Sequence, residues 1–463
     1  MDFSSANTTL WNPIIQIGIL ATLILFSNIL LRKLPFVKKT LMPTAVLSGF
    51  LLLLIRSLNI INIDGVFLEK VTYHALALGF IAMSLRIPEK NSSSSTLIGS
   101  KSGALIVSTY LVQAVVGLVV TLGLAYTVMP NLFKASGILL PMAYGQGPGQ
   151  ANNVGATYEA LGMTGGRSFG LSLAAAGFLC ACIVGVIYIN ILNRKGKFKR
   201  STDREDVSGS VTVDTFQSSN EIPISQSIDR FSIQFALVCL IYLLTYLVTH
   251  GITVLLAEVA PGLANMVSAL LWGFNFIIGS ALATVCRVII GKLRKTKIIS
   301  RQYQNNYLLS RISGLAFDVM IVAGIASINI EDLHGYILPF TILAILGGVV
   351  TFYYLKFMSD RLYPEYSEAG FLSMYGMLTG TISSGILLLR EIDPDFETPA
   401  ANNLITGSSF GIIFGAPVLL LVSLAAESDL MTWVALGLVI IYLAFLLLFM
   451  FKVGKKAEKS KKQ

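Results

Sequence analysis

The stretch YGQGPGQANNVG at residues 144–155 decides which fold this sequence can adopt. The stretch lies within a region, residues 136–162, that is apolar enough to enter a membrane. The twelve residues of the stretch nevertheless include four glycines and a proline. Glycine allows a backbone with positive φ, and Pro148 has no amide hydrogen to donate, so an unbroken helix cannot continue through this stretch. In lipid the freed backbone groups would be unpaired, so the break must be buried in protein or line a cavity.

The composition of the rest of the chain is that of a membrane protein. Of its 463 residues, 54% are hydrophobic and only 13% are charged, whereas a soluble domain has about 25% charged residues. The apolar residues come in blocks of about twenty, the length that a helix needs to cross a bilayer. This pattern excludes a water-soluble enzyme and predicts an all-α polytopic membrane protein. We place about eleven transmembrane helices at residues 13–31, 40–54, 72–85, 103–128, 167–192, 231–257, 263–290, 311–328, 335–355, 401–421 and 430–451.

The distribution of basic residues predicts how the chain is oriented. With the amino terminus outside and the carboxyl terminus in the cytoplasm, 30 of the 34 Lys and Arg residues lie on or near the cytoplasmic side. This imbalance is what the positive-inside rule requires. The net charge of +9 is therefore explained by the orientation of the chain in the membrane, and we expect no nucleic-acid partner. The four exceptions on the outer side are Arg56, Lys70, Lys134 and Arg167.

A second interrupted stretch, YGMLTGTISSG at residues 375–385, lies in the second half of the chain within residues 365–390. Like the stretch around Pro148, it is apolar but broken by glycine and hydroxyl residues. We expect both regions, 136–162 and 365–390, to form re-entrant hairpins that return to the side from which they enter. Each should lie in the protein interior, because irregular backbone is not tolerated against lipid.

The order of the predicted elements repeats along the chain. Residues 1–192 and 231–425 each contain five helices with a hairpin before the fifth. Because five is odd, the second repeat is inverted, which is the arrangement of many secondary transporters. The polar segment 193–230 should be a disordered cytoplasmic linker, with a connecting role favoured over a regulatory one. Residues 426–463 supply one extra transmembrane helix and a basic cytoplasmic tail.

The polar residues of the first tip suit a small, hard cation. Freed carbonyls and side-chain amide oxygens form an oxygen-only environment appropriate for Na⁺, and the amides that open the returning half-helix favour an anionic group. Alternatively, these side chains only satisfy the broken backbone. The amide residues concerned are Gln146, Gln150, Asn152 and Asn153.

Three further features extend this candidate site. The hydroxyls of the second tip can also bind a cation, although Ser and Thr are common at membrane helix contacts because they are small. Asp318 is the one acid in the middle of a predicted span, where carboxylates mark ion paths or pair with a neighbouring helix. Arg167 could bind a substrate carboxylate or extend to the membrane interface, and the second interpretation is favoured.

Other chemistries have little support in the sequence. The three histidines do not have the spacing of metal ligands, and all four cysteines lie in apolar stretches. The chain has no GxxxxGK[ST] nucleotide loop. Coupling to an ion gradient therefore explains transport more simply than ATP does, and we expect no cofactor and no enzymatic activity.

Three motifs resemble those of the bacterial glutamate:Na⁺ symporter family. They are GQGPGQANN at 145–153, GGRSFG at 165–170 and LLREIDPDFETPAANN at 388–403. The family's hairpins carry GGxG motifs, and Gln146 and Met377 stand here at the second glycine. The resemblance implies sodium-coupled glutamate uptake across the bacterial cytoplasmic membrane. The related architecture of hydroxycarboxylate transporters further implies a homodimer in which a mobile unit shifts its site across the membrane.

Together, the residue chemistry and the resemblance define the expected site. The substrate should contact Gly145, Gln146, Gly147, Gly149, Gln150, Gly376, Thr379, Gly380 and Arg167. Na⁺ should contact Asn152, Asn153, Asp318, Thr381, Ser383 and Ser384.

Three alternative functions stay open at this point. In the same class, the chain could transport another small carboxylate, such as a dicarboxylate or a hydroxy acid, coupled to Na⁺ or to protons. An ion channel could use the hairpins as a selectivity filter, but two dissimilar hairpins that enter from opposite sides make a poor symmetric pore. An intramembrane enzyme would need a poised nucleophile or a metal pair, and Asp318 has neither beside it in the sequence.

Overall fold

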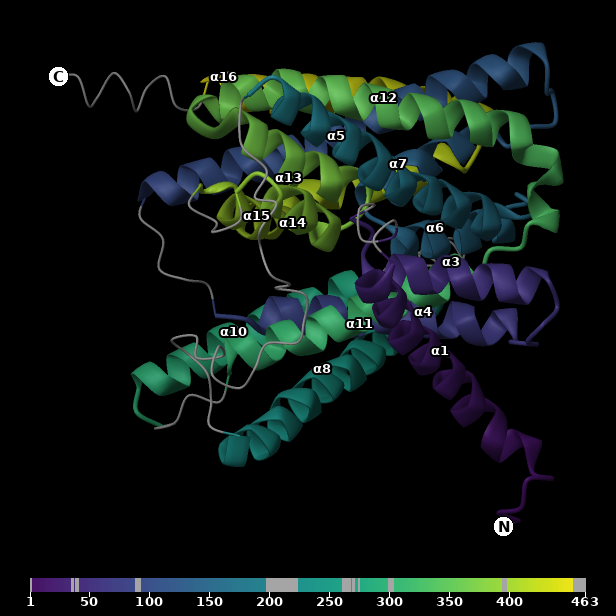
Figure 1. Ribbon diagram of the computed structural model, residues 1–463, viewed down its shortest axis with the longest axis vertical. Helices are drawn as coiled ribbons and strands as arrows, with labels where there is room; N and C mark the ends of the chain where they lie inside the picture. Colours follow the sequence, from purple (N-terminus) through teal and green to yellow (C-terminus); the bar gives the residue numbers. More distant parts are fainter. Residues whose placement is uncertain are drawn as a thin grey trace. The chain divides into compact units, whose positions relative to one another are not determined.

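The computed structural model describes residues 2–34, 37, 41–87, 93–196, 224–259, 268, 271–273, 275–298, 304–393 and 398–452. Within these ranges the protein is helical and has no β-strand. Ten of the described helices are long and apolar enough to cross a bilayer, so the chain is a multi-pass membrane protein (Figure 1). They are α1 (Thr8–Lys33), α4 (Gly65–Leu85), α5 (Ser93–Thr127), α7 (Gly166–Arg194), α8 (Ile224–Val259), α10 (Asn275–Lys295), α11 (Asn306–Ala326), α12 (Ile337–Leu362), α15 (Ala400–Ala425) and α16 (Asp429–Lys452).

The remaining predicted span forms a shorter helix. Helix α3 (Thr44–Ser57) has 14 residues, which at 1.5 Å per residue is about 21 Å, less than the hydrocarbon thickness of about 30 Å. The first part of the predicted span 263–290 and most of the linker 193–230 lie outside the described residues.

The chain forms two compact units, and each takes segments from both halves of the sequence. Unit 1 comprises Met1–Ile63, Asn91–Arg200 and Gly324–Gln463; unit 2 comprises Asp64–Lys90 and Ser201–Ala323. Both interrupted stretches found in the sequence therefore belong to unit 1.

Unit 1 combines long helices with a set of short ones. The short elements are η1 (Lys134–Ile138), η2 (Pro141–Gly145), α6 (Pro148–Ala160), η4 (Glu331–Tyr336), η5 (Pro364–Tyr366), α13 (Ser367–Thr379) and α14 (Ile382–Arg390). Rings from α7, α12 and α13 pack together, with Phe371 lying 5.0 Å from both Tyr188 and Phe352 between centroids. This aromatic cluster fixes α13 against two full-length helices.

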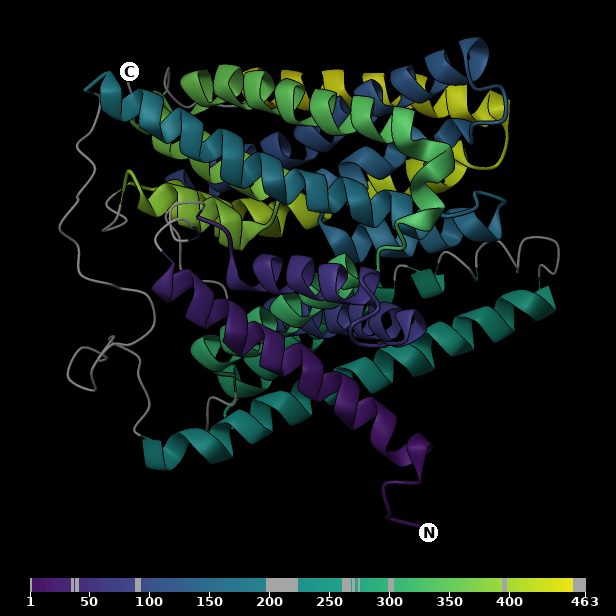
Figure 2. The ribbon, with the colours of Figure 1, turned by 45° about the vertical axis from the view of Figure 1, so that its right-hand side comes forward.

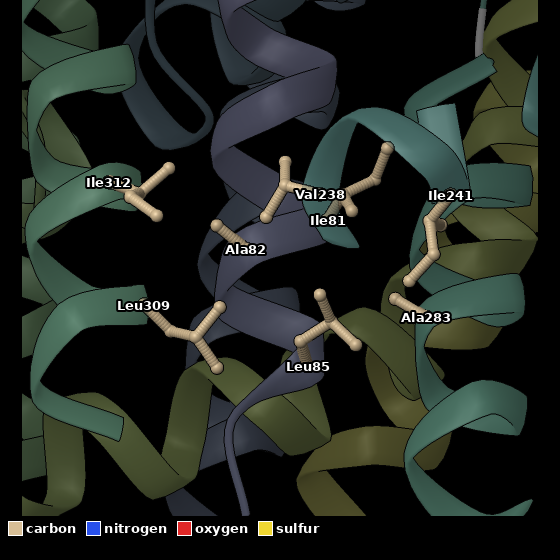
Figure 3. Packing of buried hydrophobic residues seen from close by; sticks show 8 residues of the cluster. All are labelled: Ile81, Ala82, Leu85, Val238, Ile241, Ala283, Leu309 and Ile312. Carbon is tan, nitrogen blue, oxygen red and sulfur yellow. The ribbon is translucent and has the colours of Figure 1, made fainter. Parts of the chain in front are cut away.

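Unit 2 has its own apolar core. Its helix α8 runs unbroken for 36 residues (Figure 2). Figure 3 shows side chains from α4, α8, α10 and α11 converging, and all of them are buried: Ile81, Ala82, Leu85, Val238, Ile241, Ala283, Leu309 and Ile312. Burial of one such aliphatic side chain contributes about 1.5–3 kcal/mol in water, so a water-filled gap between these helices would be unfavourable.

Candidate functional site

The first interrupted stretch is a true break in the helical backbone. A turn of π-helix at η2 ends at Gly145, and α6 begins at Pro148. Between them Gly147 has φ 85° and ψ −177°, a region that is essentially open only to glycine. Pro148 takes the first position of α6, where its missing amide hydrogen costs nothing. The glycine and the proline together produce the break that the sequence predicts.

The chain folds back at this break. Phe133, just before η1, packs its ring against that of Tyr158 in α6, with 5.3 Å between centroids. Residues 134–160 thus form two short arms that meet at their base and turn near Gly147. We call this the first broken segment.

The second interrupted stretch is also broken. Helix α13 ends at Thr379 and α14 begins at Ile382. Between them Gly380 has φ −141° and ψ −105°, outside both the helical and the extended regions, and Thr381 is extended. The two arms pack closely, because a Cβ added to Gly376 would lie 2.7 Å from the Cα of Gly385. Figure 1 shows α13 and α14 beside each other. We call residues 367–390 the second broken segment.

The turns of the two segments lie next to each other. A Cβ added to Gly147 would lie 3.8 Å from the carbonyl oxygen of Gly380 and 3.8 Å from the methyl carbon of Thr381. Helix α7 passes both segments: a Cβ at Gly177 would lie 2.3 Å from the carbonyl oxygen of Thr379. Only glycine allows such close approach of two backbones.

A glutamine from α5 bonds to the second segment and lies close to the first. The amide nitrogen of Gln113 donates to the carbonyl oxygen of Leu378, at 3.0 Å, and to the hydroxyl of Thr351, at 2.9 Å. Its amide oxygen would lie 3.0 Å from a Cβ at Gly145 and accepts no hydrogen bond. Gln113 is 1% exposed, so this unpaired oxygen has no access to bulk water.

Several other polar atoms on the two broken segments and on α7 are buried and make no hydrogen bond. An unpaired buried group of this kind costs about 1–3 kcal/mol, and a cluster of them is an arrangement that a polar ligand would stabilise. Ser384 lies within this cluster, since its hydroxyl oxygen would be 2.9 Å from a Cβ at Gly380. The atoms are both amide atoms of Gln150, the amide oxygen of Asn152, and the hydroxyls of Ser172, Tyr375, Thr381 and Ser384.

The site is electrically neutral in its side chains. Neither 141–155 nor 375–385 contains Asp, Glu, Lys, Arg or His. Its field therefore comes from backbone dipoles: the amino termini of α6 and α14 supply partial positive charge, and the carboxyl end of α13 supplies partial negative charge. Within the described residues, no group of three or more His, Cys, Asp or Glu could hold a metal ion.

Most of the residues predicted for the site lie on the two broken segments of unit 1. Gln146 is partly exposed and donates to the sulfur of Met142, at 3.7 Å, within its own arm. Thr379 donates to the carbonyl of Tyr375, at 2.7 Å, within α13. The side chain of Ser383 lies outside the described residues. The others are Gly145, Gly147, Gly149, Gln150, Asn152 and Asn153 on the first segment, and Gly376, Gly380, Thr381 and Ser384 on the second.

Arg167 lies at the opposite end of α6 from the turn. A Cβ at Gly155 would lie 2.6 Å from the Cα of Arg167, and Gly155 is eight residues, or about 12 Å, after Gly147. The guanidinium of Arg167 pairs with Glu159 at 3.1 Å, and its backbone amide donates to the same carboxylate at 2.9 Å. The structure thus places Arg167 at the base of the first segment, in an ion pair with Glu159.

Asp318 belongs to α11 of unit 2. The cluster of unpaired polar atoms described above consists of residues of unit 1 only, and its oxygens belong to uncharged groups.

Sequence reasoning missed Gln113 and Ser172. The sequence pattern does indicate both residues, because each is a polar residue inside an apolar span, where polar side chains are expected to face protein. Gln113 is the one amide in the predicted span 103–128.

No known family model matches this chain, and no curated protein is similar to it in sequence.

Proposed function

We propose that the protein is a secondary transporter that takes up glutamate together with Na⁺ across the bacterial cytoplasmic membrane. One observation carries the proposal: two broken helices, one from each half of the chain, meet at turns surrounded by buried polar groups without partners. Broken helices at membrane depth are how many transporters bind substrate and coupling ion. The two segments would then be re-entrant hairpins of inverted repeats.

The cation is proposed to bind neutral oxygens. Asn152 and Thr381 each present a buried oxygen that accepts no hydrogen bond, and Asn153 and Ser384 lie within one turn of them. Carbonyl, amide and hydroxyl oxygens are ligands for a hard cation. The cation site proposed here uses neutral oxygens of unit 1 and does not include the carboxylate of Asp318.

The carboxylate groups of the substrate are proposed to bind at the start of α6 and α14. The first amides of a helix have no partner within it, and the helix dipole favours an anion there. At α6 these amides belong to Gly149 and Gln150, since Pro148 has none. Cation and anion would thus lie side by side, and each would lower the cost of burying the other.

Transport is proposed to follow alternating access, with unit 1 as the body that carries the site and a homodimer as the assembly. The resemblance of GQGPGQANN and GGRSFG to the glutamate:Na⁺ symporters supports this mechanism. A second candidate substrate is another small dicarboxylate or hydroxy acid. Gln146 and Met377 favour this second candidate. They stand at the second glycine of the GGxG motifs, and their side chains cover backbone that a glycine would leave open to the substrate.

Uptake by the purified protein in liposomes tests this proposal. An inward Na⁺ gradient should drive accumulation of labelled glutamate, and a K⁺ gradient of the same size should not. Uptake that ignores Na⁺ but follows a pH gradient would replace Na⁺ with protons. Competition by a panel of unlabelled acids identifies the preferred carboxylate, and single-channel currents would contradict the transporter class.

A matched pair of variants tests the ion site. Thr381→Val removes a hydroxyl that has no partner and keeps the shape of the side chain. It should raise the Na⁺ concentration for half-maximal uptake about tenfold, since losing one ligand to a charged group costs about 1.5 kcal/mol. Thr341→Val, on the exposed face of α12, removes a hydroxyl that bonds only Ile337 in its own helix and should leave the Na⁺ dependence unchanged.

A further inference from the structure

Unit 2 contains a pocket of its own, where α4 ends and α11 begins. The cavity has a volume of about 310 Å³. Its lining residues are Arg86, Asn306, Tyr307, Ser310 and Arg311. Two of the five are cations, and none is an acid.

The walls of this pocket are held in place by hydrogen bonds between the two helix ends. Asn306 accepts from the amide of Ile87 at 2.7 Å and donates to its carbonyl oxygen at 2.8 Å. This paired contact joins the residues after α4 to the first residue of α11. Arg86 and Arg311 are therefore presented to one cavity by two helix ends whose geometry is fixed.

The carbonyls at the end of α4 are satisfied by a different arginine. Arg287 of α10 donates to the carbonyl oxygens of Ser84 and Arg86, each at 3.0 Å. The side chain of Arg86 is thus not needed to cap its own helix, and its buried Nε makes no hydrogen bond.

The pocket is strongly electropositive. In the described part of the chain neither Arg86 nor Arg311 forms an ion pair, and the guanidinium of Arg311 lies 4.9 Å from the centroid of the Tyr307 ring. Arg287 adds a third positive charge close to Arg86, and the amino terminus of α11 adds partial positive charge. Like charges around one cavity repel each other, so an anion would stabilise this arrangement.

The pocket also borders the apolar core of unit 2. Leu85 and Leu309, which are neighbours in sequence of Arg86 and Ser310, are both buried in that core (Figure 3). Arginines at the ends of apolar helices lie at the depth of lipid headgroups. The last turn of α10, with Lys292, Arg294 and Lys295, favours the cytoplasmic leaflet, where anionic lipids are found.

We propose that this pocket binds a phosphate group, through the guanidinium groups of Arg86 and Arg311 and the polar side chains of Asn306 and Ser310. Guanidinium matches phosphate geometry with two parallel hydrogen bonds. The phosphate belongs either to an anionic lipid headgroup or to a free phosphate ion, and both present the same oxygens to the two arginines. The site is independent of the transport proposed for unit 1.

The test measures binding to the full-length protein in neutral detergent. The probes are phosphatidylglycerol in mixed micelles, phosphatidylcholine in the same micelles, and inorganic phosphate. The thermal unfolding midpoint should rise in a saturable way with phosphatidylglycerol or with inorganic phosphate. It should not rise with phosphatidylcholine, because the choline cation neutralises that phosphate and is repelled by the two arginines. A response to the glycerolipid alone identifies a headgroup site, and a response to inorganic phosphate identifies a site for the free ion.

Three variants separate this pocket from general surface charge. Arg86→Gln and Arg311→Gln should each weaken the apparent affinity about tenfold, because each removes a charge-assisted hydrogen bond. Lys292→Gln removes a charge from the last turn of α10, outside the pocket lining, and should bind as the unmodified protein does. Arg311 is exposed, so its replacement should fold even if that of Arg86 does not. The proposal fails if neither probe binds saturably, or if Arg311→Gln changes affinity no more than Lys292→Gln.

Discussion

The two broken segments of unit 1 each interrupt a helix, but different contacts hold their arms in place. In the first segment each arm packs against a different long helix. A Cβ at Gly137 would lie 2.1 Å from the carbonyl oxygen of Gly117 in α5, and a Cβ at Gly170 in α7 would lie 2.9 Å from the carbonyl oxygen of Ala151. In the second segment the arms pack against each other, and a Cβ at Gly385 would lie 2.4 Å from the carbonyl oxygen of Ser373.

The turns differ in chemistry as well as in packing. The first turn has positive φ at Gly147 and a proline directly after it, and its polar side chains are amides. The second turn has no residue with positive φ, and its polar side chains are hydroxyls. The first segment is thus held to α5 and α7 by backbone contacts. The second is held by contacts between its own arms, by ring packing of α13 on α7 and α12, and by one backbone contact with α7.

This difference suggests which part of the site is rigid and which can adjust. Backbone contacts through glycine leave no side chain that can rotate away, so the first segment should stay fixed to its two helices. The second segment contacts α7 and α12 mainly through side-chain rings and is joined to α5 through the side chain of Gln113, and contacts made by side chains can be remade. We expect substrate-dependent changes to be larger in residues 367–390 than in residues 134–160.

The largest effect is expected from Gly137→Ala. The added methyl would meet a backbone carbonyl at 2.1 Å, so the first arm must move away from α5. Such overpacking costs about 3 kcal/mol or more. The thermal unfolding midpoint of the purified protein should fall sharply, and the yield of folded protein should fall with it.

Gly123→Ala on the same α5 is the matched control. A Cβ at Gly123 has no atom within 4 Å, and replacing glycine by alanine inside a helix stabilises it by about 0.5–1 kcal/mol. The midpoint should therefore stay constant or rise. Equal midpoints for the two variants would show that the first arm is not held by backbone contact with α5.

A smaller effect is expected from Gln113→Leu, which removes the link between α5 and the second segment. The carbonyl of Leu378 and the hydroxyl of Thr351 each lose a hydrogen bond in a buried place, at a cost of about 2 kcal/mol. Hydrogen exchange should rise in residues 367–390 more than in residues 134–160. Thr127→Val, which removes an exposed hydroxyl at the end of the same helix, should change neither region.

The sequence predicts the helices and both breaks because each depends on local physics. Apolar blocks give the spans, and Pro148 with its flanking glycines excludes a continuous helix. The described residues test these spans, and α3, with 14 residues, is about as long as the 15-residue span predicted at 40–54. The positions of the breaks, at Gly147 and at Gly380, agree with the tips read from the sequence.

The partners of these residues could not be predicted, because they depend on contacts between distant segments. Arg167 pairs with Glu159, which lies eight residues earlier in the chain, and nothing in the sequence indicates this ion pair. Gln113 is 265 residues from Leu378, to which it donates. The grouping of both broken segments in one compact unit also requires three dimensions, since unit 1 is assembled from three separate parts of the chain.

The smallest effect is expected from Gly147→Ala. No atom lies closer than 3.8 Å to the added methyl, so the substitution fits sterically and only the backbone conformation is strained. A non-glycine residue at such a φ and ψ costs about 1–2 kcal/mol, which should lower the unfolding midpoint slightly. Gly196→Ala is the control, because Gly196 also has positive φ (68°) and open space around it but lies in the loop after α7. Both variants should lose stability, and only Gly147→Ala should change the concentration of substrate that gives half-maximal uptake. If Gly196→Ala changed uptake equally, the effect would be one of general stability, and the first turn would have no special part in binding.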